Sequence, residues 1–308
     1  MTKQTLLSII IVASNNEHVF DCIDSLKPAI SGIESEVILI DNASPLKVGE
    51  KVSSKYPFVK VIRREKNGGF GENNNMGMRI AKGKYILLLN DDTKIVDKNI
   101  FKEMISWMDS RPKAGIAGCG LLNSDEATYQ GSGGYYPTLF RVFAWMSFLD
   151  DIPVLDRIIK PYHPLHGQSP LYKGTGYFKR EHKQDWVTGA FFMMRRAAMD
   201  EAGLFDEDFF LYVEEVELAA RFKDKGWSVW YLPFWKIVHY GMSTTGSEKA
   251  TIFEFQNLIL MYRKREASWK IPVLRAILKF GAALRIAVWS IMGKRKVAKI
   301  YEKAIKSF

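Results

Sequence analysis

The sequence predicts an α/β protein with a mostly parallel sheet, because short apolar runs alternate with amphipathic helical patterns. Leu7–Val12 is dominated by β-branched apolar residues, as a strand covered on both faces requires. Further strands are expected at Val37–Ile40, Phe58–Ile62 and Tyr85–Leu89. Two of the four runs end abruptly in polar residues, and ligands bind beyond the carboxyl ends of the strands in such sheets.

Helical patterns separate these strands. Val19, Ile23 and Leu26 would share one face of a helix that begins near Asn16. A second helix is expected over Asn73–Ala81. This order of strand and helix is the one that right-handed parallel crossovers produce.

The second half of the chain is less regular. Residues 129–184 are rich in glycine, proline, aromatic residues and histidine, which is typical of a functional or mobile segment in a compact domain. Regular structure is expected again from Trp186, with a helix over Val213–Lys225 and a strand over Val229–Leu232 that Pro233 closes. After about Phe253 the sequence is helical and basic.

The net charge of +10 is concentrated at the C-terminus. From Trp269 to Phe308 there are 10 basic residues and one acid, a net charge of +9, which leaves about +1 for the other residues. A basic groove on the globular body is therefore not expected, and no nucleic-acid partner is predicted. The two cysteines predict no disulfide framework, and no apolar run is long enough to span a membrane.

Acidic residues follow two of the predicted strands. Asn90, Asp91 and Asp92 come directly after one of them, and a divalent cation that holds a diphosphate would offset their buried charge. The alternative is a polar turn whose aspartates cap the next helix. Asp41 ends another strand, either as a turn residue or as a carboxylate that accepts a hydrogen bond from the ring N–H of a pyrimidine base.

A second acidic cluster, Glu214, Glu215 and Glu217, follows a run of aromatic residues. One of these carboxylates could act as a general base. The alternative is an acidic helix start that suits the helix dipole, with Glu217 pairing Arg221. His239, after a strand-like run, is either a satisfied polar residue or a further ligand for a manganese-like ion.

Seven motifs occur in a recognisable order along residues 7–243. They are Ser8–Val12, Val37–Ser44, Asn67–Gly77, Leu87–Thr93, Asp185–Ala190, Gly203–Glu207 with the acidic cluster after it, and His239 with Ser243. In content and order they resemble glycosyltransferase family 2, specifically its rhamnosyltransferase-like branch. No phosphate loop, dinucleotide fingerprint, zinc spacing or nucleophile elbow points elsewhere.

The resemblance implies a glycosyltransferase A-type fold and an inverting enzyme that uses Mn²⁺ or Mg²⁺. It implies Asp92 and His239 as metal ligands, and Glu215 as the catalytic base with Glu214 as its substitute. The implied donor-binding residues are Ala13, Asn15, Asp41, Asn67, Gly69, Phe70, Asn75, Asn90 and Asp91, and the implied acceptor-binding residues are Trp186, Gly189, Ala190 and Glu217. Residues 1–252 would form the catalytic domain, with a donor-binding half at 1–128 and an acceptor-binding half at 129–252.

Two motifs depart from the family's pattern. After the first strand, Ala13 and Ser14 stand where the family usually has an asparagine and an aromatic residue. The family's usual acid pair is Glu-Asp with a further Asp two positions on, whereas all three acids here are glutamates. The longer side chain leaves Glu214 as an alternative to Glu215.

The branch implies dTDP-L-rhamnose as the donor and a polyprenol-linked or growing polysaccharide acceptor in cell-surface glycan synthesis. A UDP-sugar is the alternative donor, because uracil and thymine share the ring N–H. Another alternative is a non-catalytic, membrane-associated scaffold that binds glycans, although the metal carboxylates are all present.

Residues 253–308 are predicted to form a basic amphipathic tail. Arg275, Lys279 and Arg285 would lie on one side of a helix with apolar residues between them, as in helices that lie in a membrane interface. Lys294–Lys296 would attract anionic lipid, so a cytoplasmic protein, peripheral on the inner face of the cell membrane, is expected. The alternatives are packing on the catalytic domain and a contact between copies in a homo-oligomer.

Overall fold

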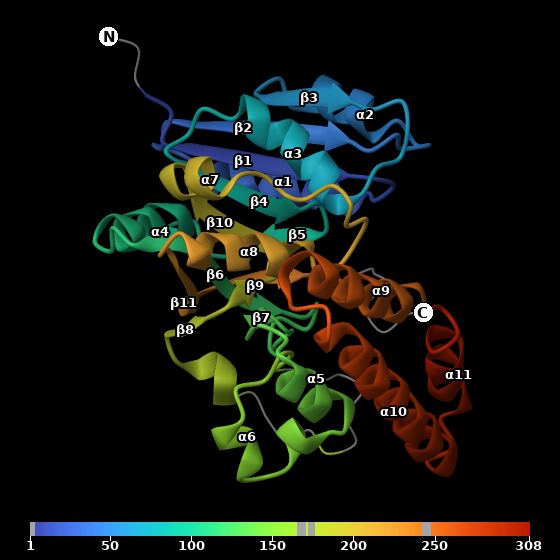
Figure 1. Cartoon of the computed structure of the whole chain (residues 1–308). Coiled ribbons are helices and arrows are strands. Elements are labelled where there is room, and N and C mark those ends of the chain that lie inside the picture. Colours follow the sequence, from blue (N-terminus) through green and yellow to red (C-terminus); the bar gives the residue numbers. More distant parts are fainter. Residues whose placement is uncertain (1–3, 165–170, 172–175, 242–247) are drawn as a thin grey trace.

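The computed structural model describes residues 4–164, 171, 176–241 and 248–308, and it has the predicted α/β architecture (Figure 1). The strands are β1 (Leu7–Ala13), β2 (Ser35–Asp41), β3 (Val59–Arg63), β4 (Tyr85–Asn90), β5 (Thr93–Ile95), β6 (Ala114–Leu122), β7 (Gly133–Gly134), β8 (His182–Gln184), β9 (Trp186–Val187), β10 (Phe191–Arg195) and β11 (Ser228–His239). The α-helices are α1 (His18–Ala29), α2 (Val48–Lys55), α3 (Phe70–Ile80), α4 (Ile100–Asp109), α5 (Leu139–Met146), α6 (Leu155–Ile158), α7 (Arg196–Ala202), α8 (Glu214–Asp224), α9 (Glu248–Arg265), α10 (Lys270–Ile291) and α11 (Arg295–Ala304). Ser243, in the last of the seven motifs, lies outside the described residues.

One large sheet has the strand order β3-β2-β1-β4-β10-β6-β11-β5, with β8 paired to β11, and β7 and β9 form a small second sheet. The first four strands are parallel, as predicted. β10 lies antiparallel between β4 and β6, so the sheet is mostly rather than wholly parallel. Because β1, β2 and β4 run in one direction, their carboxyl ends share an edge, and this edge carries the predicted site.

The central strands are buried on both faces. In β1, Ile10 packs into the hydrophobic core on one face of the sheet, whereas Ile9 and Ile11 pack into the core on the other, and all three are 0% exposed. This two-sided burial explains why the strand sequences are apolar throughout instead of alternating with polar residues.

β11 is longer than predicted. It continues through Pro233 and ends at His239, so the prediction that Pro233 closes the strand is wrong. The pairing of β11 with β6 shifts register between Leu232 and Lys236, and the proline, which has no N–H to donate, lies within this irregularity. The continuation of the strand delivers His239 to the edge that carries the site.

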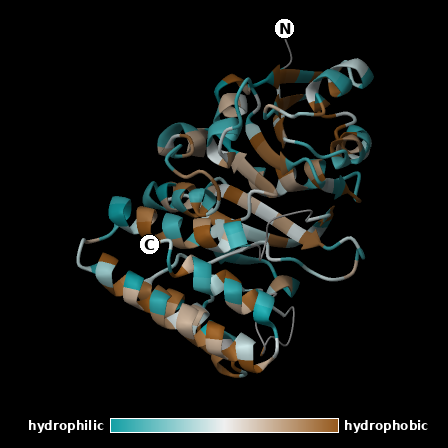
Figure 2. Cartoon of the chain, turned by 90° about the vertical axis from the view of Figure 1, so that its right-hand side faces the viewer, coloured by the Kyte–Doolittle hydropathy of each residue, from teal (hydrophilic) through white to brown (hydrophobic). Residues whose placement is uncertain are grey.

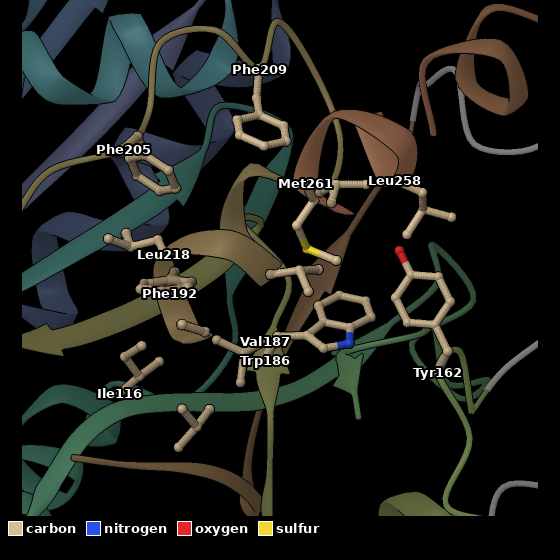
Figure 3. Packing of buried hydrophobic residues seen from close by; sticks show 14 of the residues in the cluster. Ile116, Tyr162, Trp186, Val187, Phe192, Phe205, Phe209, Leu218, Leu258 and Met261 are labelled. Carbon is tan, nitrogen blue, oxygen red and sulfur yellow. The ribbon is translucent and has the colours of Figure 1, made fainter. Parts of the chain in front are cut away.

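Helix α9 crosses the predicted boundary between residues 252 and 253. Its Leu258 and Met261 belong to the same hydrophobic core as Trp186 and Tyr162 (Figure 3). Because α9 shares this core, it is packed into the predicted catalytic domain instead of beginning a separate tail.

Helix α10 packs along α5, and α11 folds back on α9 and α10. Arg285 is only 1% exposed and donates hydrogen bonds to the carbonyl oxygens of Trp145 and Met146 and to the hydroxyl of Tyr301. The prediction that Arg285 lies on an exposed basic side with Lys279 is therefore wrong. Several apolar residues of this helix are exposed instead, and hydrophobic segments, coloured brown, recur along it in Figure 2. None of the helices in the described part of the chain is both long and apolar enough to cross a membrane.

Candidate functional site

A cavity of about 510 Å³ opens where β1, β2 and β4 end. Six of the predicted residues line it: Asn15, Asn67, Phe70, Asn90, Asp91 and Asp92. Asn16, Asn42 and Asn73 are also in its wall, which is therefore rich in amide groups that can donate to phosphate and hydroxyl oxygens. We call it the first cavity, and its volume suits a small-molecule ligand.

A second cavity, of about 430 Å³, lies beside β7, β9 and the end of β11. Three more predicted residues line it: Trp186, Glu215 and His239. Its wall also includes Thr188 and the rings of His163, Tyr212 and Tyr240. Aromatic faces with a few polar groups suit a ligand that has both apolar and hydroxylated surfaces.

The two cavities meet at Asp92 and His239. Asp92 lines the first cavity, His239 lines the second, and Asp92 Oδ1 lies 3.2 Å from His239 Nε2. The strands create this contact, because Thr93 of β5 pairs with His239 of β11 and Tyr240 N–H donates to the Asp92 carbonyl oxygen. A ligand that reaches from one cavity toward the other would pass this pair.

The predicted division at residues 128 and 129 does not separate the cavities. Phe210 and Leu211 line the first cavity, and Leu121 and Asn123 line the second. Each cavity is therefore built from both predicted halves.

Adjacent carboxylates carry negative charge into the first cavity. Burial, followed by repulsion from Asp92, raises the pKa of Asp91 to about 7. A divalent cation would remove this repulsion, because hard cations prefer carboxylate oxygen ligands. Asp92 and His239 lie close enough for one cation to contact both side chains.

Gln130 fixes the ring of His239. Its Nε2 donates to the His239 carbonyl oxygen at 2.5 Å, so its Oε1 accepts from His239 Nδ1 at 2.7 Å. A neutral imidazole then carries its proton on Nδ1, and Nε2, which faces Asp92, can bind a metal. Among the described residues, no three His, Cys, Asp or Glu side chains are grouped to hold a metal ion, so the protein would supply two such ligands beside those of the substrate and water.

Glu215 lines the second cavity, whereas Glu214 is buried and lines neither cavity. Within the described part of the chain, Oε2 of each glutamate has no hydrogen-bond partner. Burial raises the pKa of Glu215 to about 7, and burial together with repulsion from Glu215 raises the pKa of Glu214 well above its ordinary value. Glu214 therefore holds its proton more tightly than a free carboxyl does, while Glu215 titrates near neutrality, as suits a general base.

A strained turn precedes the two glutamates. Tyr212 and Val213 have φ angles of 70° and 72°, although neither is glycine. On α9, the Asn257 side chain donates to the carbonyl oxygens of Leu211 and Tyr212 at 2.8 and 2.9 Å. Such angles persist only where the surroundings impose them, and the two hydrogen bonds from Asn257 help to hold the turn in place.

Asp41 does not line the first cavity. Its buried carboxylate accepts hydrogen bonds from the backbone N–H groups of Ser44 and Gly49 and from Arg63. The geometry does not support the predicted contact between Asp41 and a base, because internal donors occupy both of its oxygens. The next residue, Asn42, lines the cavity instead.

Asn42 also joins two parts of the cavity wall. Its Nδ2 donates to the Gly68 carbonyl oxygen, and its Oδ1 accepts from the Gly68 N–H. The amide keeps a second N–H and a second oxygen lone pair beyond these two bonds. Such a group can complement a pyrimidine ring that offers one donor and one acceptor.

Asn75 and Glu217 also lie away from both cavities. The Asn75 amide is hydrogen-bonded to the backbone N–H and C=O of Phe205. Glu217 accepts hydrogen bonds from Arg221 on its own helix and from Arg265 on α9, and the second of these joins α8 to α9. In this structure both side chains therefore join parts of the fold, and neither is brought to a cavity.

The predicted glycines allow close packing. A Cβ atom on Gly189 would lie 2.3 Å from the Phe70 ring, and one on Gly69 would lie 2.6 Å from the Phe210 carbonyl oxygen. Neither glycine lines a cavity. They act indirectly, because their lack of a side chain lets Phe70 and its loop reach their places.

The predicted alanines act through the backbone. The Ala13 carbonyl oxygen accepts from the Asn42 N–H, and the Ala190 carbonyl oxygen accepts from the Asn90 N–H. Ala13 and Ala190 line neither cavity. They position the asparagines that do.

Sequence reasoning missed His163, Gln130 and Asn257. His163 lines the second cavity, and its Nε2 lies 2.5 Å from Oε1 of Glu254 on α9. For His163 and Gln130, the one indication in the sequence is the unusual composition of residues 129–184, which is typical of a functional segment. Asn257 carries no such signal, because nothing in a single sequence distinguishes it from other helical amides.

Known proteins share this sequence pattern and fold. The sequence model described as "Glycosyl transferase family 2" matches residues 8–203, more than half of the chain. Over 262 residues the chain is 23% identical to the N-acetylglucosaminyl-diphospho-decaprenol L-rhamnosyltransferase of Mycobacterium tuberculosis (strain H37Rv), which covers 81% of each chain. It is 24% identical over 179 residues to rhamnosyltransferase WbbL of Escherichia coli (strain K12), which covers 56% of this chain and 61% of WbbL.

A solved structure supports the fold. Mannosyltransferase PcManGT from Pyrobaculum calidifontis, in complex with GDP-Man and Mn²⁺, matches with a TM-score of 0.57 at 13% identity, over 99% of this chain and 86% of that chain. The architecture is the glycosyltransferase A-type fold expected from the sequence. With the family match, this makes the protein an enzyme, and the chain belongs to glycosyltransferase family 2.

Proposed function

We propose that the protein transfers L-rhamnose from dTDP-L-rhamnose to a polyprenol-linked or growing polysaccharide acceptor, with inversion at the anomeric carbon. The name of the mycobacterial relative, an L-rhamnosyltransferase for N-acetylglucosaminyl-diphospho-decaprenol, supports the donor sugar and the kind of acceptor. A UDP-sugar is the alternative donor, because uracil and thymine present the same ring N–H.

The meeting of two cavities at Asp92 and His239 carries this proposal. A nucleotide diphosphate in the first cavity would place the anomeric carbon near the junction. An acceptor in the second cavity would approach from the other side, beside Glu215. Direct displacement from opposite sides inverts the anomeric carbon and needs no covalent intermediate.

The residues around the cavities suit this reaction. Asn42 would hydrogen-bond the pyrimidine ring, and Asn15 and Asn67 would bind ribose and phosphate oxygens. Asp92 and His239 would hold Mn²⁺ or Mg²⁺, which would neutralise negative charge on the leaving diphosphate. The Mn²⁺ in the PcManGT complex supports this cofactor. Glu215 would remove the proton from the attacking hydroxyl.

We also infer that the enzyme works in the cytoplasm, peripheral on the inner face of the cell membrane. A polyprenol-linked acceptor would be held in that membrane. The C-terminal segment, with its net charge of +9, would be attracted to the anionic surface.

A panel of nucleotide sugars tests donor and metal together. Purified protein would be assayed with dTDP-L-rhamnose, UDP-glucose, UDP-N-acetylglucosamine or GDP-mannose as the donor and a polyprenyl-diphosphate-linked sugar as the acceptor. Each donor would be tested in the presence of Mn²⁺, Mg²⁺ or EDTA. We expect transfer from dTDP-L-rhamnose to exceed the others by about tenfold or more, and EDTA to abolish it. Faster transfer from a UDP-sugar would establish the alternative donor, and full activity in EDTA would exclude the metal.

Asn257→Leu is expected to lower kcat by about 10- to 100-fold and to leave donor affinity nearly unchanged, because a small displacement of Glu215 slows the chemical step. The substitution leaves the carbonyl oxygens of Leu211 and Tyr212 without their amide partner. Steady-state kinetics and calorimetric titration with dTDP would measure the two effects. Gln256→Leu is the matched control, because Gln256 lies beside Asn257 on α9 but donates to the Ser307 carbonyl oxygen near the C-terminus. An equal loss of kcat in this control would rule out a specific role for the turn.

A further inference from the structure

Helix α10 presents an apolar stripe to the outside along its length. Val273, Phe280 and Ile291 are 39, 54 and 86% exposed. The other exposed positions of this helix are alanine, proline and serine, apart from Lys279. Because the outer face of a helix on a water-soluble protein is normally polar, this pattern indicates a surface that is covered in use.

Helix α5 extends the same surface. The rings of Phe143 and Phe280 stack with their centroids 6.1 Å apart. Phe140, one turn before Phe143, is 59% exposed. Both helices lie at the lower end of the molecule in Figure 1. We call the exposed apolar residues of α5 and α10 the apolar surface.

Cationic residues adjoin the apolar surface. Lys294–Lys296 follow the end of α10 after two residues and are exposed, as is Lys299 on α11. They belong to the segment with a net charge of +9, whereas the remaining residues carry about +1. Apolar residues bordered by cations match an anionic bilayer interface. Two copies of so basic a surface would repel each other, which argues against a homo-oligomer at this place.

The apolar surface and the second cavity share a helix. Trp145 of α5 contacts His163, which lines the cavity, with ring centroids 5.2 Å apart. Phe143 of the same helix contacts Phe280 on α10. A membrane bound at the apolar surface would therefore lie one helix away from the wall of the second cavity.

We propose that α5 and α10 together insert their apolar surface into an anionic bilayer and hold the second cavity beside it. Its role in acceptor delivery rests on the proposed lipid-linked acceptor. This mode of membrane binding differs from that of a helix that binds lipid through one basic side, because Arg285 is buried and the inserted residues are apolar.

The test uses the full chain with phosphatidylcholine vesicles, with and without phosphatidylglycerol. Phe280→Glu/Ile291→Glu should weaken flotation with phosphatidylglycerol vesicles by about tenfold or more. Phe234→Glu is the matched control, because Phe234 is 63% exposed on β11, and it should bind as the wild type does. Ala287→Glu is a milder second variant on the exposed face, and thermal unfolding would confirm that each variant is folded.

Activity separates this proposal from the proposed function. The double variant should lose transfer to a vesicle-embedded polyprenol acceptor and keep transfer to a short, water-soluble one. If the wild type glycosylates neither acceptor while the variant loses vesicle binding, the proposed function is wrong and the proposed membrane-binding surface is supported. Unchanged vesicle binding by the folded variants would overturn the proposal that this surface binds membranes. The proposal would also fail if sedimentation velocity showed wild-type dimers that the substitutions dissociate while vesicle binding stays the same.

Discussion

Replacing Asp92 with alanine is expected to lower sugar transfer by about 10³-fold or more while the protein stays folded. Charge neutralisation by a metal contributes several kcal/mol to such a transition state, and each 1.36 kcal/mol is a factor of ten in rate. The fold should tolerate the change, because Asp92 repels Asp91 and helps to raise its pKa to about 7. Transfer at saturating Mn²⁺ and a thermal unfolding curve would measure the two effects.

Asp24→Ala is the control for this substitution. Asp24 forms a surface ion pair with Lys55 at 3.0 Å, and its loss should change transfer by less than about twofold. Calorimetry adds a readout that does not depend on turnover, since Mn²⁺ should tighten dTDP binding by the wild type but not by Asp92→Ala. Near-normal turnover that still requires metal would mean that the ligand lies elsewhere.

Glu215→Gln should reduce transfer by about 10²- to 10⁴-fold and leave donor binding intact. Glutamine has nearly the same shape as glutamate, but it does not accept the proton of the attacking hydroxyl. Because burial raises the pKa of Glu215 to about 7, wild-type kcat/KM for the acceptor should rise with pH through about 7 and then level off. Initial rates at saturating Mn²⁺ should show this rise in the wild type and not in the variant.

Stability gives an independent check on the same carboxyl. Its pKa in the folded state lies above its ordinary value of 4.5, so the folded state binds more protons than the unfolded state between pH 4.5 and about 7. Stability contributed by this group is present below pH 4.5 and is lost as pH rises through about 7. Glu215→Gln should remove this loss and raise the melting temperature relative to the wild type above pH 7.

Glu214→Gln decides between the two glutamates. Glu214 is buried, lines neither cavity, and has a pKa raised well above its ordinary value by burial and by repulsion from Glu215. An amide of the same size should therefore leave transfer within a few-fold of the wild type. A large loss in this variant, with Glu215→Gln active, would make Glu214 the base.

The parallel strands could be predicted because burial on both faces produces a continuous apolar run, as in Ile9–Ile11. The antiparallel insertion of β10 (Phe191–Arg195) between β4 and β6 could not be predicted from the sequence. A short apolar run fits a strand or a buried helix equally well, and its neighbours are fixed by pairing with distant residues.

Motifs located the segments of the site but not the directions of the side chains. Asp41 and Asn42 are adjacent, yet internal donors occupy the first while the second lines the cavity. Helical periodicity likewise placed Arg285 on one side of its helix, but it did not show which side is buried. That depends on α5, which lies more than a hundred positions earlier in the sequence.

The contact between Asn90 and His239 has a consequence for the order in which the molecule is made. These side chains lie 3.3 Å apart although 149 positions separate them in the chain. During synthesis β4, which carries Asn90, and the turn with Asp92 that follows it emerge long before β11, and pairing over such a distance forms late in folding. We therefore expect a nascent or C-terminally clipped chain to lack His239, the proposed second metal ligand, and to leave nucleotide sugar unconsumed until β11 joins the sheet.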